Sequence, residues 1–262
     1  CVGDDWQAIY RFAGSDISFV RKFESNFGFT ETVKLDQTFR FNDKIEAVTT
    51  KFVSKNSTQI PKIIQAQEKS KQPQVILHSP EKKNDDIFIE VLKEISKRSS
   101  DSKNTILCLG RYNYLQDGLS WSIAIEEFKK FKITFKTVHS AKGLEADYVI
   151  VLGMKSGKYG FPSEITDDPI LNAVLSEPEN YLHAEERRLF YVALTRARKA
   201  VHLVIDHSSP SSFVSEIKKY KGLVESFGFA GIEPVYCPSC VTGELIQRTS
   251  RYGTFYGCQN FP

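Results

Sequence analysis

The chain has 262 residues, enough for one sizeable α/β domain with a small appendage or for two modest domains. Its 35 Lys and Arg residues against 32 Asp and Glu residues leave a net charge of +3, so any nucleic-acid site must be local rather than a property of the whole surface. Apolar residues make up 41% of the chain, as in ordinary globular proteins, and no apolar run approaches the ~18 residues typical of a membrane span.

The first residue of the chain and its cysteine content indicate how the chain arises and in which compartment it resides. It begins at Cys1 and its only methionine is Met154, which indicates a fragment or a processed product, and the first residues resemble neither a signal peptide nor a transit peptide. The five cysteines are few and odd in number, and three of them lie after Tyr236, which favours a reducing cytoplasm over a secreted disulfide scaffold. Cys1 and Cys108 are interpreted as incidental or buried thiols.

The apolar pattern alternates between strand and helix periods over residues 1–220. A first helix is expected over Ser15–Phe27, with Ser15 as its N-cap. The expected strands that follow are Thr32–Leu35, Val75–His78, Thr105–Leu109, Ile133–Val138, Tyr148–Leu152 and Ala200–Ile205. The expected helices are Asp43–Ser54, Asp85–Lys97, Ser122–Lys130, Ala184–Thr195 and Ser212–Lys219. Strands separated by helices predict an α/β fold with a mainly parallel sheet covered on both faces.

Three polar or glycine-containing stretches are expected outside regular structure. Gln65–Gln74 and Arg98–Asn104 are predicted to be surface loops. Tyr220–Pro234 carries three glycines and a proline and is predicted to be a linker into a distinct C-terminal piece.

Four polar segments stand at the expected ends of strands and helices. In chain order they are VGDDWQAIYRFAG (2–14), LDQTFRF (35–41), TVHSAKGLEAD (137–147) and EERRLFYVALTRAR (185–198). Such segments suit an α/β sheet that holds a ligand at the carboxyl edge of its strands. The turn of a glycine and two acidic residues in the first segment is a weak signal alone. The prediction of a ligand site depends on the presence of all four segments.

Together and in this order, these segments strongly resemble motifs III to VI of the UvrD/Rep-type superfamily 1 DNA helicases, over residues 1 to about 206. The short spacing and the cysteine-rich tail are most similar to the DNA helicase IV branch. Two hallmarks of the family are absent from the sequence, the G-x-x-x-x-G-K-[ST] phosphate loop and the acidic magnesium motif, and the resemblance places both upstream of Cys1.

The resemblance implies four parts. Residues 1–30 end a first RecA-like motor domain, 31–220 form the second RecA-like motor domain, 221–235 are a linker, and 236–262 form a truncated β zinc-ribbon module. Because half of the nucleotide site would then be missing, the isolated chain is expected not to hydrolyse ATP. Fewer than a hundred residues separate Arg40 from Thr137, so the large accessory insertion of the UvrD type is expected to be missing or much reduced.

By resemblance, Arg40 and Arg196 reach the γ-phosphate of ATP across the cleft between two motor domains, and Gln7 senses the same phosphate. Guanidinium groups suit this task because they stay charged and can donate to two oxygens as negative charge develops in phosphoryl transfer. The cofactor implied is ATP with Mg²⁺, whose ligands are expected outside this chain.

The remaining nucleotide contacts also come from the resemblance. Phe39 stands where the family usually has a tyrosine stacked on adenine, and the ring face survives that change. Glu145 would meet the ribose, and Gly143 belongs to the same nucleotide-binding segment.

Tyr10 and Phe12 match the aromatic residues of the family on which single-stranded DNA stacks, an interaction that is independent of sequence. Thr137, His139 and Lys142 match the segment that links the nucleotide to the DNA. The implied partners are single-stranded DNA, DNA duplex junctions and the N-terminal motor domain of the same protein, with no membrane. The implied direction of movement is 3′→5′.

The tail contains a Cys-x-x-Cys pair, Cys237 and Cys240, followed by Cys258. A Cys-x-x-Cys turn followed by a second such turn is what tetrahedral zinc requires, and the pattern resembles the zinc ribbon of bacterial type I topoisomerases. That family expects a fourth cysteine past Pro262, so three Zn²⁺ ligands are expected here. Basic and aromatic residues interleave nearby and would suit a small single-strand-binding surface: Arg248, Arg251, Tyr252, Phe255 and Tyr256.

Each of these residues also has an alternative, purely structural interpretation. Arg40 and Arg196 could form structural ion pairs, Tyr10 and Phe12 could be core aromatics, and His139 could be a structural histidine. The charged run from Glu185 to Arg188 is predicted to be a solvated, salt-bridged helix face.

Two functions from different classes follow. The first is an ATP-driven DNA translocase of which this chain is the second motor half. The second is a non-motor DNA-binding or recruitment module with a degenerate RecA-like fold and a zinc platform. Retention of Arg40, Arg196, Gln7 and Glu145 favours the first. A helicase fused to a nuclease lacks support, because no metal-binding carboxylate cluster follows Arg198.

Overall fold

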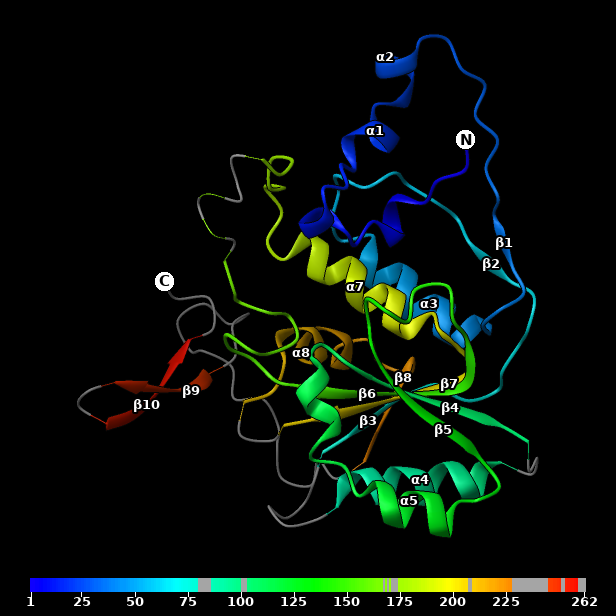
Figure 1. The fold of residues 1–262 in the computed structure, drawn as a ribbon, viewed down its shortest axis with the longest axis vertical. Coiled ribbons are helices and arrows are strands. Elements are labelled where there is room, and N and C mark those ends of the chain that lie inside the picture. The colour runs from blue at the N-terminus through cyan, green and yellow to red at the C-terminus, as the bar shows by residue number, and fades with distance from the viewer. Residues whose placement is uncertain are drawn as a thin grey trace. The chain divides into compact units, whose positions relative to one another are not determined.

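The computed structural model describes residues 1–79, 86–99, 103–166, 168, 170, 174–206, 209–227, 245–250 and 253–258. The chain divides into two units, Cys1–Phe227 and Gly228–Pro262. The first unit is built on six strands in the order β5-β4-β6-β7-β3-β8 (Figure 1). Their bounds are β3 (Val75–His78), β4 (Thr105–Gly110), β5 (Lys132–Thr137), β6 (Ala146–Met154), β7 (Ala197–Ile205) and β8 (Val224–Phe227). Every pairing in this sheet is parallel, which confirms the predicted α/β fold.

Burial explains why these runs form strands. All four residues of β3 are buried, as are all but the first of β4, which is the pattern of inner strands covered on both faces. In β5, at one edge of the sheet, exposed and half-buried residues alternate, and its two lysines take exposed positions.

Helices cover both faces of the sheet. Figure 1 shows α4 and α5 on one face and α3, α7 and α8 on the other. Their bounds are α3 (Asp43–Val53), α4 (Ile87–Arg98), α5 (Trp121–Glu127), α7 (Ala184–Leu194) and α8 (Ser212–Lys218). Asn42, Asp86 and Ser211 cap α3, α4 and α8 by accepting backbone N–H bonds, so polar residues fix where these helices begin.

Each face of the sheet has its own packing. On the α4 side, Phe88, Leu92 and Ile95 join Ile106 and Ile150 in one buried apolar cluster. On the other side, aromatic rings from α3, α7 and α8 pack edge-on or stacked, at centroid distances of 5.0 to 5.5 Å: Phe52, Phe190 and Phe213. No described helix is long and apolar enough to cross a membrane.

The N-terminal part departs from the predictions in two places. Ser15–Phe27 does not form one helix but two short ones, α1 (Ser18–Arg21) and α2 (Phe23–Phe27), because the backbone leaves helical geometry at Lys22. Ile17, not Ser15, precedes the first of them. The apolar stripe does not face a core, since Phe19 and Phe27 are exposed, and short helices without tertiary packing are marginal.

The strand expected at Thr32–Leu35 is wrong. These four residues are exposed and irregular, so their β-branched and apolar side chains have no buried face to occupy. The chain instead forms β1 (Gln37–Thr38), which pairs in parallel with β2 (Gln65–Ala66), inside a stretch expected to be a loop.

The C-terminal part also differs from the sequence pattern. Residues 224–227, expected to belong to the linker, form β8 and extend the sheet beside β3. Its side chains are half-buried or exposed, so the strand carried little apolar signal. In the second unit, β9 (Leu245–Ser250) pairs antiparallel with β10 (Gly253–Cys258). Cys237, Cys240, Arg251 and Tyr252 lie outside the described residues.

Helix α7 does not present its charged residues to solvent as predicted. Arg187 and Arg188 are buried, and the guanidinium of each pairs with a carboxylate. Arg187 pairs with Glu216 of α8 at 2.8 Å, and Arg188 pairs with Glu179 at 2.5 Å. The run is salt-bridged as predicted, but its two arginines lie inside the protein because α7 is covered by α3, α8 and the N-terminal segment, while Glu185 and Glu186 are half-buried.

Two histidines from neighbouring strands lie stacked within the sheet core. Nε2 of His78 and Nδ1 of His202 are 2.9 Å apart, so one ring donates a hydrogen bond to the other. Burial lowers the pKa of His78 to about 4 and lowers that of His202 well below its usual range. Both rings are therefore neutral at pH 7.

This pair predicts sensitivity to acid. A histidine in the unfolded chain has a pKa near 6.5, whereas the pKa of His78 in the folded chain is about 4. The unfolded state therefore binds more protons between these two pH values, and the free energy of unfolding falls as the pH drops through that range. We expect the free energy of unfolding to fall by about 2 kcal/mol from pH 7.5 to 5 through His78 alone. Urea titrations at both pH values measure this. An unchanged pH slope in the double variant His78→Phe/His202→Leu would contradict it.

Candidate functional site

The residues expected to contact the nucleotide, Glu145 and Arg196, lie at the amino ends of β6 and β7. The sequence segments had predicted a site at the carboxyl edge of the sheet. Glu145 immediately precedes β6, Arg196 immediately precedes β7, and the backbone N–H of Ala146 donates to the carbonyl of Arg196 at 3.0 Å. Asn42 ties the segment after β1 to the same place by donating to the carbonyls of Arg198 and Lys199. The cause is the turn after β5, which carries the chain back to the start of β6 without a helix.

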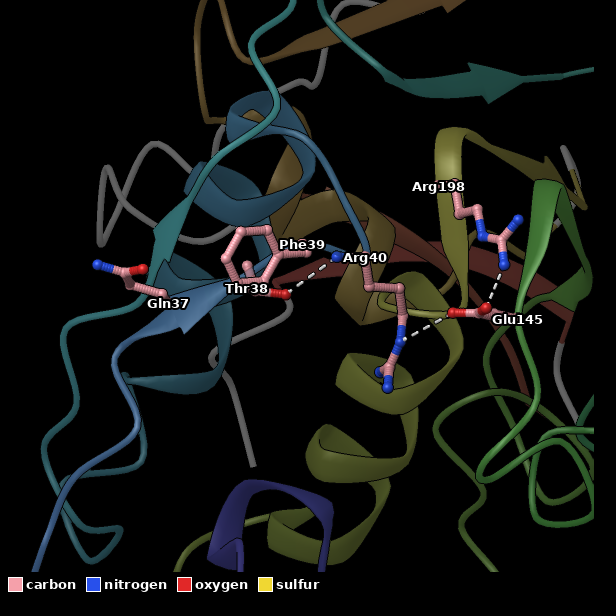
Figure 2. A pocket seen from close by; sticks show the side chains of 6 residues that line it. All are labelled: Gln37, Thr38, Phe39, Arg40, Glu145 and Arg198. Atoms are coloured by element: carbon pink, nitrogen blue, oxygen red, sulfur yellow. Dashed lines mark hydrogen bonds and ion pairs between the residues drawn. The ribbon is translucent and has the colours of Figure 1, made fainter.

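An open pocket of about 460 Å³ lies at this edge (Figure 2). It is lined by Gln37, Thr38, Phe39, Arg40, Glu145 and Arg198. In Figure 2, Arg40 and Arg198 approach Glu145 from opposite sides, with Nε of Arg40 3.5 Å from Oε2. The hydrogen bond from Arg198 holds the pKa of Glu145 below its usual range. The ring of Phe39 is 75% exposed and so offers a free face.

Arg196 is unusual for an arginine because only 1% of its surface is exposed. Its Nε donates to the carbonyl of Val192 at 3.0 Å, its Nη1 to that of Leu144 at 3.3 Å, and its Nη2 contacts Oε1 of Gln7 at 3.5 Å. Among the residues that the structure describes, no carboxylate forms an ion pair with it. Burial lowers its pKa to about 10, and the positive charge of Arg40 adds to the effect. A desolvated cation is thus held beside a second cation.

Gln7 is held against Arg196 by the N-terminal segment. It ends the short 3-10 helix η1 (Asp5–Gln7), and its Nε2 donates to Asp4 at 2.5 Å. The segment is anchored by Trp6, which is buried, donates to the carbonyl of Ile60 at 3.1 Å and packs edge-on against Tyr191 of α7 at 5.5 Å. The side-chain amide therefore has a defined position.

The turn that follows β5 joins this region to a group of aromatic rings. Nζ of Lys142 donates to the backbone carbonyl of Gln7 at 3.0 Å and lies 4.9 Å above the ring of Tyr10. The hydroxyl of Tyr10 donates to the carbonyl of His139 at 2.9 Å. Gly143 has a φ of +90°, a left-handed conformation that residues with a Cβ rarely adopt, so the turn depends on glycine at this position.

Tyr10, Phe12 and His139 form one aromatic group. Phe12, in the 3-10 helix η2 (Arg11–Ala13), meets His139 edge-on at 5.2 Å and Tyr10 at 6.0 Å. Phe12 is 61% exposed and Tyr10 is half-buried, so neither is a core aromatic. Burial lowers the pKa of His139 to about 4, and the charge of Arg111 adds to this, so the imidazole is neutral at pH 7.

The structure gathers the sequence-predicted residues into two linked groups. Phe39, Arg40 and Glu145 line the pocket, Arg196 contacts Gln7 and the carbonyl before Glu145, and Gly143 lies in the turn after β5. The second group is the aromatic one, with Tyr10, Phe12, His139 and Lys142. Thr137 begins the connecting turn, where its Oγ1 is 2.9 Å from Oγ of Ser140. Arg198 and the Gln37–Thr38 pair, which also line the pocket, were missed; the exposed arginine at the start of β7 was the available signal for the first.

Of the three expected zinc ligands, Cys258 alone lies among the residues that the structure describes. Cys258 pairs across the hairpin with Leu245, so it lies at the end through which the chain enters from the Cys240 side. Among the described residues, no group of three His, Cys, Asp or Glu side chains is gathered. The other two expected ligands, Cys237 and Cys240, lie outside the described residues.

Comparison with known proteins decides the family. Residues 86–208 match the model of the UvrD-like helicase C-terminal domain. This chain carries a UvrD-like helicase C-terminal domain. Residues 234–262 match the topoisomerase DNA binding C4 zinc finger. The predicted resemblance to a UvrD/Rep-type helicase followed by a topoisomerase-type zinc ribbon is thus confirmed.

Curated relatives agree with this UvrD-like assignment. The chain is 38% identical to DNA helicase IV of Escherichia coli (strain K12) over 217 residues, which cover 83% of the chain and 31% of that relative. It is 30% identical to DNA helicase II of Rickettsia typhi over 49% of the chain and 20% of the relative. It is also 30% identical to ATP-dependent DNA helicase PcrA of Staphylococcus aureus, over 51% and 18%. The chain spans less than a third of each of these relatives.

Proposed function

We propose that this chain is the second motor half of a cytoplasmic, ATP-dependent 3′→5′ DNA helicase or translocase. ATP with Mg²⁺ would bind between it and a first motor domain, which would supply the phosphate loop and the magnesium ligands. The UvrD-like domain supports the assignment, as do relatives that are named DNA helicases and ATP-dependent DNA helicases. The direction of movement is taken over from the family resemblance.

The observation that carries the proposal is the buried, carboxylate-free guanidinium of Arg196 beside the charge of Arg40. A buried cation that is repelled by a second, partly exposed cation is stabilised by an anion, and a γ-phosphate whose negative charge grows in the transition state would supply one. Gln7, within 3.5 Å of Arg196, would sense the same phosphate. Because the contact of Arg40 with the exposed Glu145 is a surface ion pair, it costs little to exchange for a phosphate.

The rest of the pocket suits the other parts of the nucleotide. The exposed ring of Phe39 would stack on adenine, and the Glu145 carboxylate, kept ionised by Arg198, would accept hydrogen bonds from the ribose hydroxyls. Gly143 would let the turn pass close to the nucleotide without a side chain in the way.

Single-stranded DNA would stack on the rings of Tyr10 and Phe12, with His139 and Lys142 beside them and Thr137 at the start of the same turn. Neutral His139 would offer a ring face, whereas Lys142 would offer charge to the phosphates. Lys142 also donates to the backbone carbonyl of Gln7, so movement of the turn on DNA binding would reach the γ-phosphate sensor directly. This contact is the proposed link between DNA binding and ATP hydrolysis.

The C-terminal unit would hold Zn²⁺ through Cys237, Cys240 and Cys258, and would add a small surface for single-stranded DNA. The match to a C4 zinc finger and the place of Cys258 on the hairpin support this role. The metal would act structurally, by crosslinking short turns that have too little apolar surface to fold alone.

Steady-state ATP hydrolysis by the full-length protein, with and without single-stranded DNA, tests the proposal. We expect DNA to stimulate hydrolysis in the full-length protein, and the 262-residue chain alone to give no rate above a purified blank. A full-length protein that binds DNA but is silent with every DNA tried would favour the non-motor DNA-binding or recruitment module.

A further inference from the structure

A short segment that leads into α7 contacts the N-terminal segment beside the proposed DNA-stacking rings. The carbonyl of Ser176 accepts from Nε of Arg11 at 2.8 Å, and Oγ of Ser176 donates to the carbonyl of Ser15 at 3.4 Å. Pro178 follows, and its ring fixes φ, so the backbone at this point is stiff. Figure 1 shows the start of α7 next to the N-terminal segment, which is drawn in dark blue. We call residues 176–179 the bridging segment.

Glu179, the last residue of the bridging segment, pairs with two arginines at once. Its Oε2 lies 2.6 Å from Nη2 of Arg21 in α1, and its Oε1 lies 2.5 Å from Nη1 of Arg188 in α7. The side chains of Arg21, Glu179 and Arg188 are 17%, 13% and 3% exposed, so water screens the two pairs little. A single carboxylate therefore joins α1 to α7.

Arg188 extends this contact to the proposed γ-phosphate sensor. Its Nε donates to the carbonyl of Ala8 at 2.6 Å, directly after Gln7, whose side chain contacts Arg196 at 3.5 Å. Arg196 follows the end of α7 by two residues, so both arginines belong to one continuous stretch of chain. The distance from Gln7 to Arg196 therefore depends on where Arg188 holds the backbone. Glu179, which pairs with the guanidinium of Arg188, fixes that position.

The bridging segment also fixes the residue that precedes Phe12. The backbone N–H of Arg11 donates to Oε1 of Glu185 in α7 at 3.0 Å, while the guanidinium of Arg11 donates to the carbonyl of Ser176. The stretch from Gln7 to Phe12 is thus attached to α7 near both of its ends. A base that stacks on Phe12 would therefore order the same stretch that places Gln7.

We propose that Glu179 is a positioning residue for the DNA-stimulated hydrolysis of ATP. By pairing with two arginines it keeps the N-terminal segment on α7, so that a base stacked on Phe12 also fixes Gln7 against Arg196. Glu179 touches neither nucleotide nor DNA in this scheme, which rests on the proposed function. It adds a second connection, from α7, to the one that Lys142 makes from the turn after β5.

Steady-state ATP hydrolysis by the full-length protein tests this role, with kcat and KM for ATP measured with and without an oligothymidylate. The variants are Glu179→Gln and Arg21→Ala, and Glu177→Gln is the matched control, because Glu177 is exposed and belongs to the same segment. We expect the ratio of kcat with DNA to kcat without DNA to fall about 3-fold to 30-fold in both variants, with KM for ATP unchanged. Arg21→Lys keeps the charge that Glu179 binds, so it should retain most of the wild-type ratio, and Glu177→Gln should match the wild type.

Three other outcomes overturn the inference. If DNA stimulates the wild type and both variants equally, or if the rates with and without DNA fall in the same proportion, Glu179 has no part in the DNA-stimulated step and the proposed function stands. A variant that no longer binds the oligothymidylate would assign the effect to DNA binding itself. If no DNA stimulates the wild type, the proposed function fails as well.

Circular dichroism melts establish whether each variant is folded at the assay temperature. Glu179→Gln leaves the buried guanidinium of Arg188 without this carboxylate, so it carries the larger risk of unfolding. Should it melt below the assay temperature, Arg21→Ala decides, because it leaves the pair of Glu179 with Arg188 in place.

Discussion

Replacing Arg196 with alanine in the full-length protein should lower the rate of DNA-stimulated ATP hydrolysis about a thousandfold or more, while DNA binding persists. The guanidinium is buried and forms no ion pair with the described residues, so under the proposed function its charge would act on a bound phosphate with little screening. Arg196→Lys keeps the charge but cannot donate from two nitrogens to two oxygens, so it should recover only part of the rate.

Arg196 also donates to the carbonyls of Val192 and Leu144, and the experiment must separate that structural part. Thermal unfolding and equilibrium binding of DNA provide the separation, since a fold defect would reduce both. Lys199→Ala is the matched control, because Lys199 lies on β7 three residues after Arg196, is exposed and pairs with Asp147 rather than lining the pocket. We expect it to hydrolyse ATP at the wild-type rate. Equal losses in the two variants, or a loss of DNA binding with Arg196→Ala, would argue against the phosphate contact.

The sheet could be predicted from the sequence because its inner strands carry an unmistakable signal. Val75–His78 was predicted with the bounds that β3 has, and the cores of β4, β6 and β7 were located, since a strand buried on both faces must be apolar throughout. Thr32–Leu35 has the same residue types but no layer to cover it. Composition within a segment does not tell whether the rest of the chain will bury it.

The sequence segments that form the site could be predicted, but the way in which they contact one another in space could not. Tyr10 and His139 are 129 residues apart, and only the structure reveals the hydrogen bond between them. The amino-end position of the pocket could not be foreseen, because it depends on a turn that crosses from the end of β5 to the start of β6 without a helix. Arg198 was missed for a similar reason, since its partner Glu145 comes from a different strand end.

Charged residues on α7 were misread because charge normally indicates solvent. Arg187 is only 6% exposed, yet it donates to the carbonyl of Phe52 at 2.8 Å and to both carboxylate oxygens of Glu216 at 3.0 and 2.8 Å. Its guanidinium also lies 4.1 Å above the Phe52 ring. The partners come from α3 and α8, which are distant in sequence, so no local spacing rule could reveal them.

This burial makes Arg187→Ala the variant with the largest expected loss of stability, about 3 to 5 kcal/mol in the free energy of unfolding. The alanine leaves the Glu216 carboxylate inside the protein, with Tyr220 and Lys55 as its remaining partners, and leaves the Phe52 carbonyl without its donor. Urea titration of wild type and variant at pH 7 measures the difference. The matched control is Arg98→Ala, which removes a pairing of similar geometry with Glu225 at an exposed site and should cost about 1 kcal/mol or less.

The pH dependence and a double variant test the mechanism of that loss. Although burial alone would raise the pKa of Glu216, its bonds from Arg187 hold it below its usual range. The stability that the pair contributes is therefore present above about pH 4.3, the ordinary pKa of a glutamate, and is lost as the pH falls below it. In Arg187→Met/Glu216→Leu no charge stays buried, so part of the stability should return. A double variant as unstable as Arg187→Ala would show that packing at Phe52, rather than the abandoned carboxylate, sets the cost.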